Sequence, residues 1–203
     1  MIQRSGPHIY KSDIPTFLNY IRAYRLWRIG YDGRDPWLLS LNDRFKWLYK
    51  EESHFRCSLF SLSHKTLDLS CTCGIYGWKK WRKEHLKEID EGSVFGLINL
   101  WGKVIEHDLG YRAEYAYPSE FIIWCEICRS KKNLTGIFFR QRKYLKVICS
   151  KCWNPHGNSN VTQMLILYRD FGELPEMLDS TQIKTIIESL HSLYGTSELT
   201  KIN

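Results

Sequence analysis

Alternating apolar and polar positions recur along the first two thirds of the chain and predict short β-strands. The run 20–29 (YIRAYRLWRI) is rich in aromatic and β-branched residues, and the stretches 93–107 and 111–117 alternate on either side of residues 108–110 (DLG). Two alternating runs joined by a short turn with glycine are typical of a β-hairpin. We therefore expect a hairpin there, with Pro118 at its end.

Glycines mark the expected bends and stops of these elements. Gly96 and Gly102 interrupt the first strand of the hairpin, which indicates bends or close approach of another backbone. Residues 73–78 read as a short strand that passes into a basic helix over 79–91, and Gly92 is placed to end that helix.

The clearest helical periodicity lies near the end of the chain. We expect helical structure after residue 158, with Ser180 as an N-cap and Gly195 as a stop. Apolar residues recur at i, i+3, i+4 and i+7 spacing, which indicates an amphipathic helix: Ile183, Ile186, Ile187, Leu190, Leu193 and Tyr194. This face is expected to pack on the rest of the protein, and docking on a partner is the alternative.

Two pairs of cysteines have the spacing of a zinc ribbon. Cys125 and Cys128 form one CxxC pair, Cys149 and Cys152 form another, and 20 residues separate the pairs. Four thiolates complete the tetrahedral shell of a structural Zn²⁺ ion. Redox exchange is the competing interpretation, but it uses one pair at the start of a helix, whereas the second pair here ends a predicted strand.

The other three cysteines surround a histidine and predict a second zinc site. Cys57, His64, Cys71 and Cys73 follow the pattern C-x6-H-x6-C-x-C within a long irregular connection, which a metal ion would order. Three buried thiols beside a surface histidine are the alternative, and His54 is another candidate for the fourth ligand. A zinc deaminase is excluded because its signature requires a glutamate two residues after the histidine.

These elements predict an α+β protein in three segments. Residues 1–119 form a small, curved, barrel-like β-rich domain with the cysteine/histidine zinc site and one basic helix. Residues 120–155 form the four-cysteine zinc ribbon, and residues 156–203 form a C-terminal helical segment. With 43% hydrophobic and 25% charged residues, the composition is that of a globular protein.

The charge distribution indicates a polyanionic partner. The net charge is +7, the pI is about 9.0, and aromatic residues make up 14% of the chain. Glu126 is the only acid between Cys125 and Cys152. Basic residues in this ribbon could neutralise phosphates while aromatic side chains stack on bases. A solvated basic hairpin is the alternative. The candidate phosphate-binding residues are Arg129, Lys131, Lys132, Arg140, Arg142, Lys143 and Lys146.

The leading hypothesis is a zinc-stabilised, non-enzymatic nucleic-acid-binding module, with the partner being DNA or RNA. The alternative is a protein–protein adaptor in a larger, nucleoprotein-type complex that docks through the ribbon or the C-terminal helix. A small hydrolase that uses His107 and Glu114 as an acid–base pair is a third hypothesis. No signal peptide and no apolar run of membrane-spanning length is visible, so a cytoplasmic protein is expected.

One segment resembles known sequences. The stretches CGIYGWK (73–79) and VFGLINLWGKVIEHDLGYRAEYAYP (94–118) are similar to a segment of bacterial proteins to which no activity is attached. The resemblance covers less than a quarter of the chain and implies no function.

Overall fold

The computed structural model describes residues 9–11, 20–41, 45–49, 51–54, 57, 67–81, 92–153 and 175–200. About half of these residues lie in strands, and α3 (Ser180–Tyr194) is the one helix among them. The strands are β1 (Ile9–Lys11), β2 (Ile21–Tyr31), β3 (Pro36–Ser40), β4 (Ser53–His54), β5 (Ile75–Trp78), β6 (Val94–Glu106), β7 (Gly110–Ile123), β8 (Leu134–Phe139), β9 (Tyr144–Cys149), β10 (Glu176–Leu178) and β11 (Ser197–Glu198).

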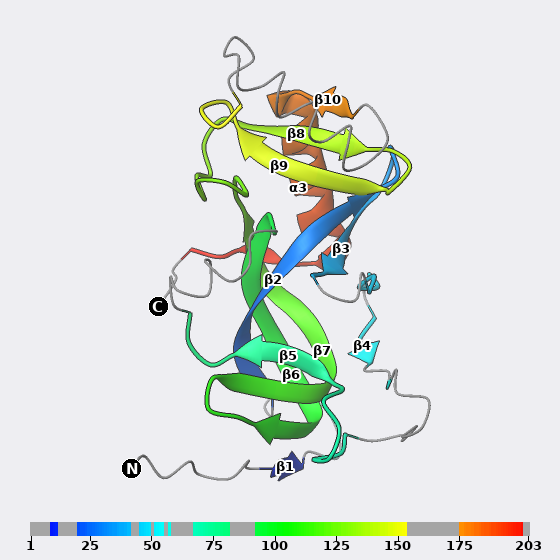
Figure 1. The fold of residues 1–203 in the computed structure, drawn as a ribbon, viewed down its shortest axis with the longest axis vertical. Helices are drawn as coiled ribbons and strands as arrows, with labels where there is room; N and C mark the ends of the chain where they lie inside the picture. Colours follow the sequence, from blue (N-terminus) through cyan, green and yellow to red (C-terminus); the bar gives the residue numbers. More distant parts are fainter. Residues whose placement is uncertain are drawn as a thin grey trace.

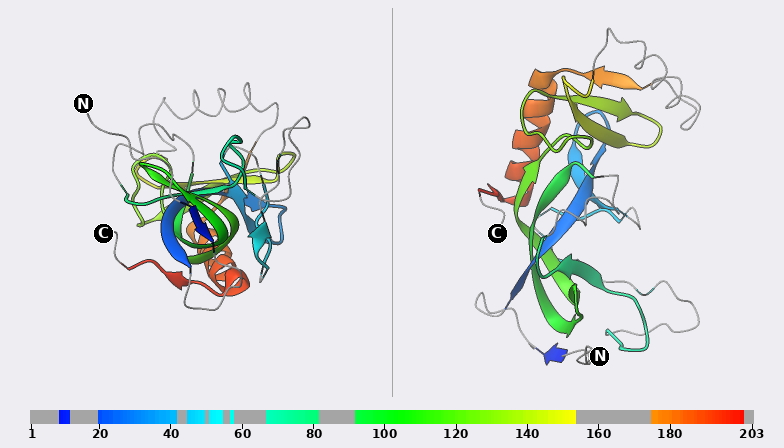
Figure 2. Two further views of the ribbon diagram at one scale, coloured as in Figure 1. Left: turned by 90° about the horizontal axis from the view of Figure 1, so that it is seen from below. Right: turned by 60° about the vertical axis from the view of Figure 1, so that its left-hand side comes forward.

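Four strands close into a ring. β6 pairs with β7, β7 with β5, β5 with β2, and β2 again with β6. Viewed from below, β2, β6 and β7 curl around one axis (Figure 2). The expected barrel-like, strand-rich part and the C-terminal helix are confirmed. The molecule as described is mostly β-sheet.

Strand β2 joins the ring to the hairpin of β8 and β9. Its first seven residues pair with β6, while Ile29 and Gly30 pair with Leu145 and Tyr144 of β9. The strands β8, β9 and β10 therefore continue the same sheet, at the opposite end of the molecule from β5 (Figure 1). Of the expected segment boundaries, the one between residues 119 and 120 falls inside β7.

Strand β2 is buried on both faces because two cores lie against it. Ala23, Trp27 and Ile29 belong to the main core, whereas Tyr24 and Leu26 belong to a smaller aromatic cluster on the other face. This burial explains why the strand is rich in large apolar residues on both faces instead of alternating with polar ones.

The hairpin of β6 and β7 forms as predicted, but Pro118 does not end it. β7 continues to Ile123, and the pairing register shifts between Leu97 and Ile98, so that Ser119 is an extra residue in β7. A bulge tolerates a proline because no ladder hydrogen bond is required of it there. The expected close approach at Gly96 is confirmed, since a Cβ atom at this position would lie 2.1 Å from the carbonyl oxygen of Glu120.

Helix α3 begins one residue earlier than the sequence indicated. Asp179 is the N-cap instead of Ser180, because its side chain accepts hydrogen bonds from the amides of Thr181 and Gln182, both at 2.8 Å. Gly195 ends the helix in the left-handed conformation (φ 60°), as predicted. Residues 176–178 form β10, not helix, and residues 154–174 lie outside the described part of the chain.

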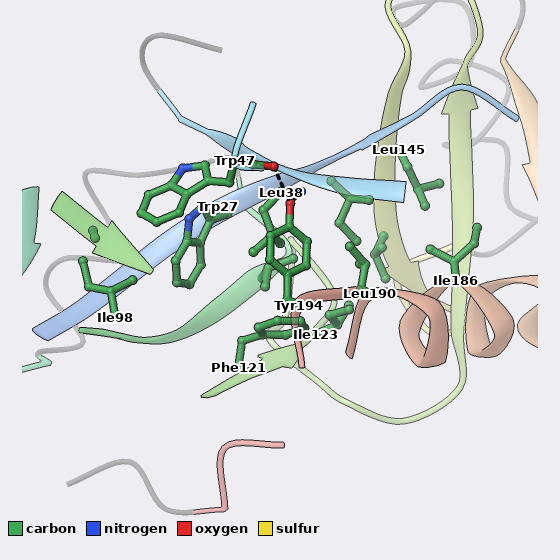
Figure 3. Packing of buried hydrophobic residues seen from close by; sticks show 14 of the residues in the cluster. Trp27, Leu38, Trp47, Ile98, Phe121, Ile123, Leu145, Ile186, Leu190 and Tyr194 are labelled. Atoms are coloured by element: carbon green, nitrogen blue, oxygen red, sulfur yellow. Dashed lines mark hydrogen bonds between the residues drawn. The ribbon is translucent and has the colours of Figure 1, made fainter. Parts of the chain in front are cut away.

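The apolar face of α3 packs on the body of the protein, as expected. Ile183, Ile186, Leu190 and Tyr194 are buried in the main core (Figure 3). The Tyr194 hydroxyl donates to the carbonyl of Trp47 (2.7 Å) and accepts from the amide of Leu38 (3.0 Å), which ties the end of the helix to the chain around β3. α3 is too short and too polar to cross a membrane.

The basic helix expected over 79–91 does not begin at Lys79. Residues 79–81 are not helical, because the Lys79 amide donates to the carbonyl of Leu109 (3.1 Å) and Trp81 packs on Phe95, with ring centroids 4.2 Å apart. Residues 82–91 lie outside the described part of the chain.

Candidate metal centres

The four ribbon cysteines converge at the ends of two strands. Cys125 and Cys128 follow β7, Cys149 ends β9, and Cys152 lies three residues later. Their sulfur atoms lie within 4.8 Å of one another, with 3.4 Å between those of Cys128 and Cys149, and no disulfide joins them. Thiolates bound tetrahedrally at about 2.3 Å from a metal ion lie about 3.8 Å apart. The group is therefore able to hold a metal ion.

Backbone geometry shapes both cysteine pairs into tight turns. In the first pair the Arg129 amide donates to the Cys125 carbonyl (2.9 Å), and Arg129 has a positive φ of 61°. In the second pair the amides of Cys152 and Trp153 donate to the Cys149 carbonyl. Burial acts to raise the pKa of the Cys149 thiol, but hydrogen bonds from the Cys152 backbone and from neighbouring thiols lower it to about 7. Burial, followed by hydrogen bonds among the thiols, raises the pKa of Cys152 instead, so the four thiols differ in how readily they form the thiolate that a metal requires.

A buried carboxyl group lies between the two cysteines of the first pair. Glu126 is 3% exposed and accepts a hydrogen bond from the Tyr144 hydroxyl (3.0 Å). Burial raises its pKa, while the Lys146 ammonium 3.8 Å away opposes that rise. This contact attaches the first turn to β9. The sequence did not reveal it, because a glutamate inside a CxxC pair is usually exposed.

Arg129 has a structural role and is not available as a free basic side chain. Its guanidinium lies 5.4 Å from the Trp124 ring, and Nη1 donates to the carbonyl of Gly92 (3.0 Å). The indole Nε1 of Trp124 donates to the same carbonyl (3.0 Å). The ribbon is thereby attached to the segment that precedes β6, and the contact of Arg129 with phosphate stays a prediction.

Three cysteines form the second group. The sulfurs of Cys57, Cys71 and Cys73 lie within 4.8 Å of one another, with 3.8 Å between those of Cys57 and Cys71. Burial, followed by hydrogen bonds among the thiols, raises the pKa of Cys73 to about 12. The thiols can hold a metal ion together with a fourth ligand. The expected ligand, His64, lies outside the described residues.

The alternative ligand His54 is not part of this group. Its ring lies 4.8 Å from that of Tyr115, and within the described part of the chain the metal-competent set contains only the three cysteines. Tyr115 in turn stacks on Trp101, with ring centroids 6.0 Å apart.

The polar side chains near the turn of the β6–β7 hairpin make structural contacts. Arg112 is 2% exposed and hydrogen-bonds the loop that carries Cys71 and Cys73. Glu114 accepts from the amides of Leu67 (3.2 Å) and Lys103 (2.9 Å). Burial, followed by the charge of Arg112, lowers the pKa of His107. Both carboxylate oxygens of Glu114 thus have backbone partners, and the hydrolase hypothesis gains nothing from this geometry.

Folding brings acids to the basic ribbon from distant parts of the chain. Arg140 pairs with Glu176 (2.7 Å), and Lys131 with Glu198 (3.4 Å). Lys143 is close enough to Asp32 to contribute to lowering the pKa of that carboxyl, after the hydrogen bonds from the Asp35 and Arg34 amides. Among the other candidates, Lys146 faces the buried Glu126, while Lys132 and Arg142 are exposed. The sequence could not show these pairings because each acid is remote in the chain.

Comparisons with protein-family models, with curated protein sequences and with solved structures found no match to the chain. The function is therefore inferred from the residues and their geometry.

Proposed function

We propose that the protein is a zinc-stabilised, non-enzymatic module that binds nucleic acid through its ribbon. Four thiolates form a closed, soft coordination shell that suits Zn²⁺ and leaves no position for a substrate. The three-thiol group takes a second Zn²⁺ ion with His64 as its fourth ligand. Elemental analysis of the purified protein should find two zinc ions per chain.

The distribution of unbalanced charge on the folded ribbon supports this proposal best. At the turn between β8 and β9, Arg140 and Lys143 face acids from other elements. At the metal end, Lys132 and Lys151 are exposed, and neither has an acidic partner among the described residues. Lys151 lies between two ligands and Lys132 four residues after a third, so the ion holds both lysines near one surface. Closely spaced, exposed ammonium groups suit a phosphate backbone.

Fluorescence anisotropy with generic single- and double-stranded oligonucleotides at two salt concentrations tests the proposal. The double substitution Lys132→Ala with Lys151→Ala should weaken binding roughly tenfold at low salt and reduce the salt slope by about 1.5, since each lysine contributes one phosphate contact. The matched control is Lys80→Ala with Lys184→Ala, which removes the same charge from exposed positions outside the ribbon. The control should change binding far less.

Two results would contradict the proposal. One is the absence of binding even at low salt. The other is an equal loss of affinity in both double variants, which would indicate a general effect of net charge. If the triple substitution of Arg140, Arg142 and Lys143 to alanine abolishes binding while the metal-end variant does not, the contact lies at the turn of the hairpin.

An adaptor role is the second candidate, and exposed apolar residues at the other end of the molecule favour it. Leu69, Tyr76 and Leu109 are 50%, 47% and 63% exposed. Leu69 and Tyr76 flank Cys71 and Cys73 in the chain, and the Tyr76 hydroxyl donates to the Thr72 carbonyl. Leu109 lies at the turn of the hairpin, where its carbonyl accepts from the Lys79 amide. Co-purification of a stoichiometric protein that survives nuclease treatment and is lost on Leu109→Ser would support this role over nucleic-acid binding.

A further inference from the structure

Arg112 is a buried cation in contact with the loop that carries two metal-binding cysteines. It belongs to β7, opposite Tyr76 of β5, and is 2% exposed. Within the described residues no carboxylate lies within ion-pairing distance of its guanidinium group. A buried charge without a counter-ion is costly unless its hydrogen bonds are satisfied and an opposite charge lies nearby.

The guanidinium satisfies its donors on the cysteine loop. Nη1 donates to the carbonyls of Cys71 and of Cys73, the latter at 2.9 Å, and Nη2 donates to the carbonyl of Asp68 (3.1 Å). Nε donates to Nε2 of His107 (3.2 Å), which requires a neutral imidazole there. A single side chain therefore fixes the backbone on both sides of Cys71 and at Cys73. A planar fork of donors can do this, whereas a lysine cannot.

Gly74 makes room for this arrangement directly after Cys73. It has a positive φ of 128°, and a Cβ atom at this position would lie 2.9 Å from Cγ of Arg112. The left-handed conformation turns the chain from the cysteines into β5, and the missing side chain lets the arginine pass. A glycine at position 74 is therefore needed for the Arg112 side chain to reach the cysteine loop.

The charge of a filled site would complement that of the arginine. Metal binding converts thiols to thiolates. Three thiolates and a divalent ion carry a net charge of about −1, which a neutral fourth ligand would not change. We propose that Arg112 is the positioning residue of the second metal site, where it holds the ligand loop and supplies the counter-charge of an anionic three-thiolate centre. This inference rests on the proposal that the three-thiol group holds zinc.

Metal content measured on purified variants tests the inference. Wild type should contain two zinc ions per chain, and Arg112→Met should contain one, with the ribbon ion retained. Arg112→Lys should keep both ions but lose the second to a competing chelator at concentrations 10- to 100-fold lower, the usual effect of removing an outer-shell partner. After substitution with Co²⁺, the lost absorption should be that of a three-sulfur centre and the remaining absorption that of a four-sulfur centre.

A matched core variant separates positioning from simple loss of stability. Val104→Ala removes buried apolar volume from β6, across the ladder from Ala113 beside Arg112, and removes none of the hydrogen bonds between Arg112 and the cysteine loop. This variant should keep both ions. Retention of both ions with unchanged chelator competition in Arg112→Met and Arg112→Lys would overturn the inference, and so would equal loss of metal in Val104→Ala. A wild-type content of one ion, with the ribbon filled, would remove the second site itself and leave the ribbon proposal intact.

Discussion

The hydroxyl group of Tyr144 donates a 3.0 Å hydrogen bond to the buried carboxyl group of Glu126. Tyr144 begins β9, and Glu126 lies between Cys125 and Cys128, two of the four clustered cysteines. The contact therefore links the turn that carries these two cysteines to the sheet.

Tyr144→Phe should destabilise the protein, because it leaves a buried carboxyl group with one partner fewer. The expected loss of unfolding free energy is about 1–3 kcal/mol, measured by urea denaturation of the metal-loaded protein. Tyr20→Phe, at an exposed tyrosine, is the control and should have no effect. An unchanged midpoint for Tyr144→Phe would show that the contact contributes nothing.

Gly96→Ala should destabilise the hairpin of β6 and β7. The new methyl group would lie 2.1 Å from the Glu120 carbonyl oxygen, a backbone atom, so the two strands must separate. We expect a loss of about 1–3 kcal/mol or more. Gly195→Ala is the comparison, because that site is open and only its φ of 60° resists a side chain, at a cost of about 1 kcal/mol. Thermal melts should show a larger loss of stability for Gly96→Ala than for Gly195→Ala.

Asp179→Ala should weaken α3, whereas Ser180→Ala should not. The aspartate side chain accepts hydrogen bonds from the amides of Thr181 and Gln182, and the Asp179 amide donates in return to Oε1 of Gln182 (2.8 Å). Loss of such a cap costs about 1 kcal/mol. Guanidinium denaturation distinguishes the two positions, and a larger effect at Ser180 would contradict the assignment.

Removal of the ribbon metal should unfold the ribbon. A structural zinc site contributes on the order of 10–16 kcal/mol of apparent binding free energy, comparable with the net stability of a domain, about 5–15 kcal/mol. Treatment with EDTA should reduce the near-ultraviolet circular dichroism of the aromatic side chains, to which Trp124 and Tyr144 beside the ribbon contribute, and added Zn²⁺ should restore it. If the spectrum does not change although the metal has been removed completely, the metal has no structural role.

His191 should make the protein less stable in mild acid. Its ring stacks on Phe121 at 4.3 Å, and burial lowers its pKa in the folded state. The unfolded chain therefore takes up the proton first, so the stability is fully present above about pH 6.5 and is lost as the pH falls through the folded pKa. Between about pH 7 and about pH 5.5, His191→Phe should lose less stability than wild type. A parallel decline in both would exclude this histidine.

Local patterns predicted those elements whose signal lies within a few residues. The hairpin follows from alternation around residues 108–110, the ribbon from two CxxC pairs, and the end of α3 from Gly195. Where neighbouring residues are chemically similar, the prediction failed by one position. Asp179 and Ser180 are both good N-caps, and only the geometry selects the first.

Long-range pairing was beyond the sequence. Nothing local indicates that β2 pairs with both β6 and β9, or that Glu176 approaches Arg140. The burial of Arg112 could not be predicted for the same reason. A charged residue near a hairpin turn is normally solvated, and its burial depends on carbonyl groups supplied by a loop about forty residues earlier.

Strand β2 connects the ring of strands to the ribbon within one sheet. Residues Ile21–Trp27 of β2 pair with β6 in the ring, and Ile29 and Gly30 pair with β9. A cut between residues 119 and 120 would therefore divide β7 and also remove β9 from β2. Each fragment would then expose unpaired strand edges, which promote aggregation. Biochemical dissection of this protein is therefore better served by point substitutions than by truncation.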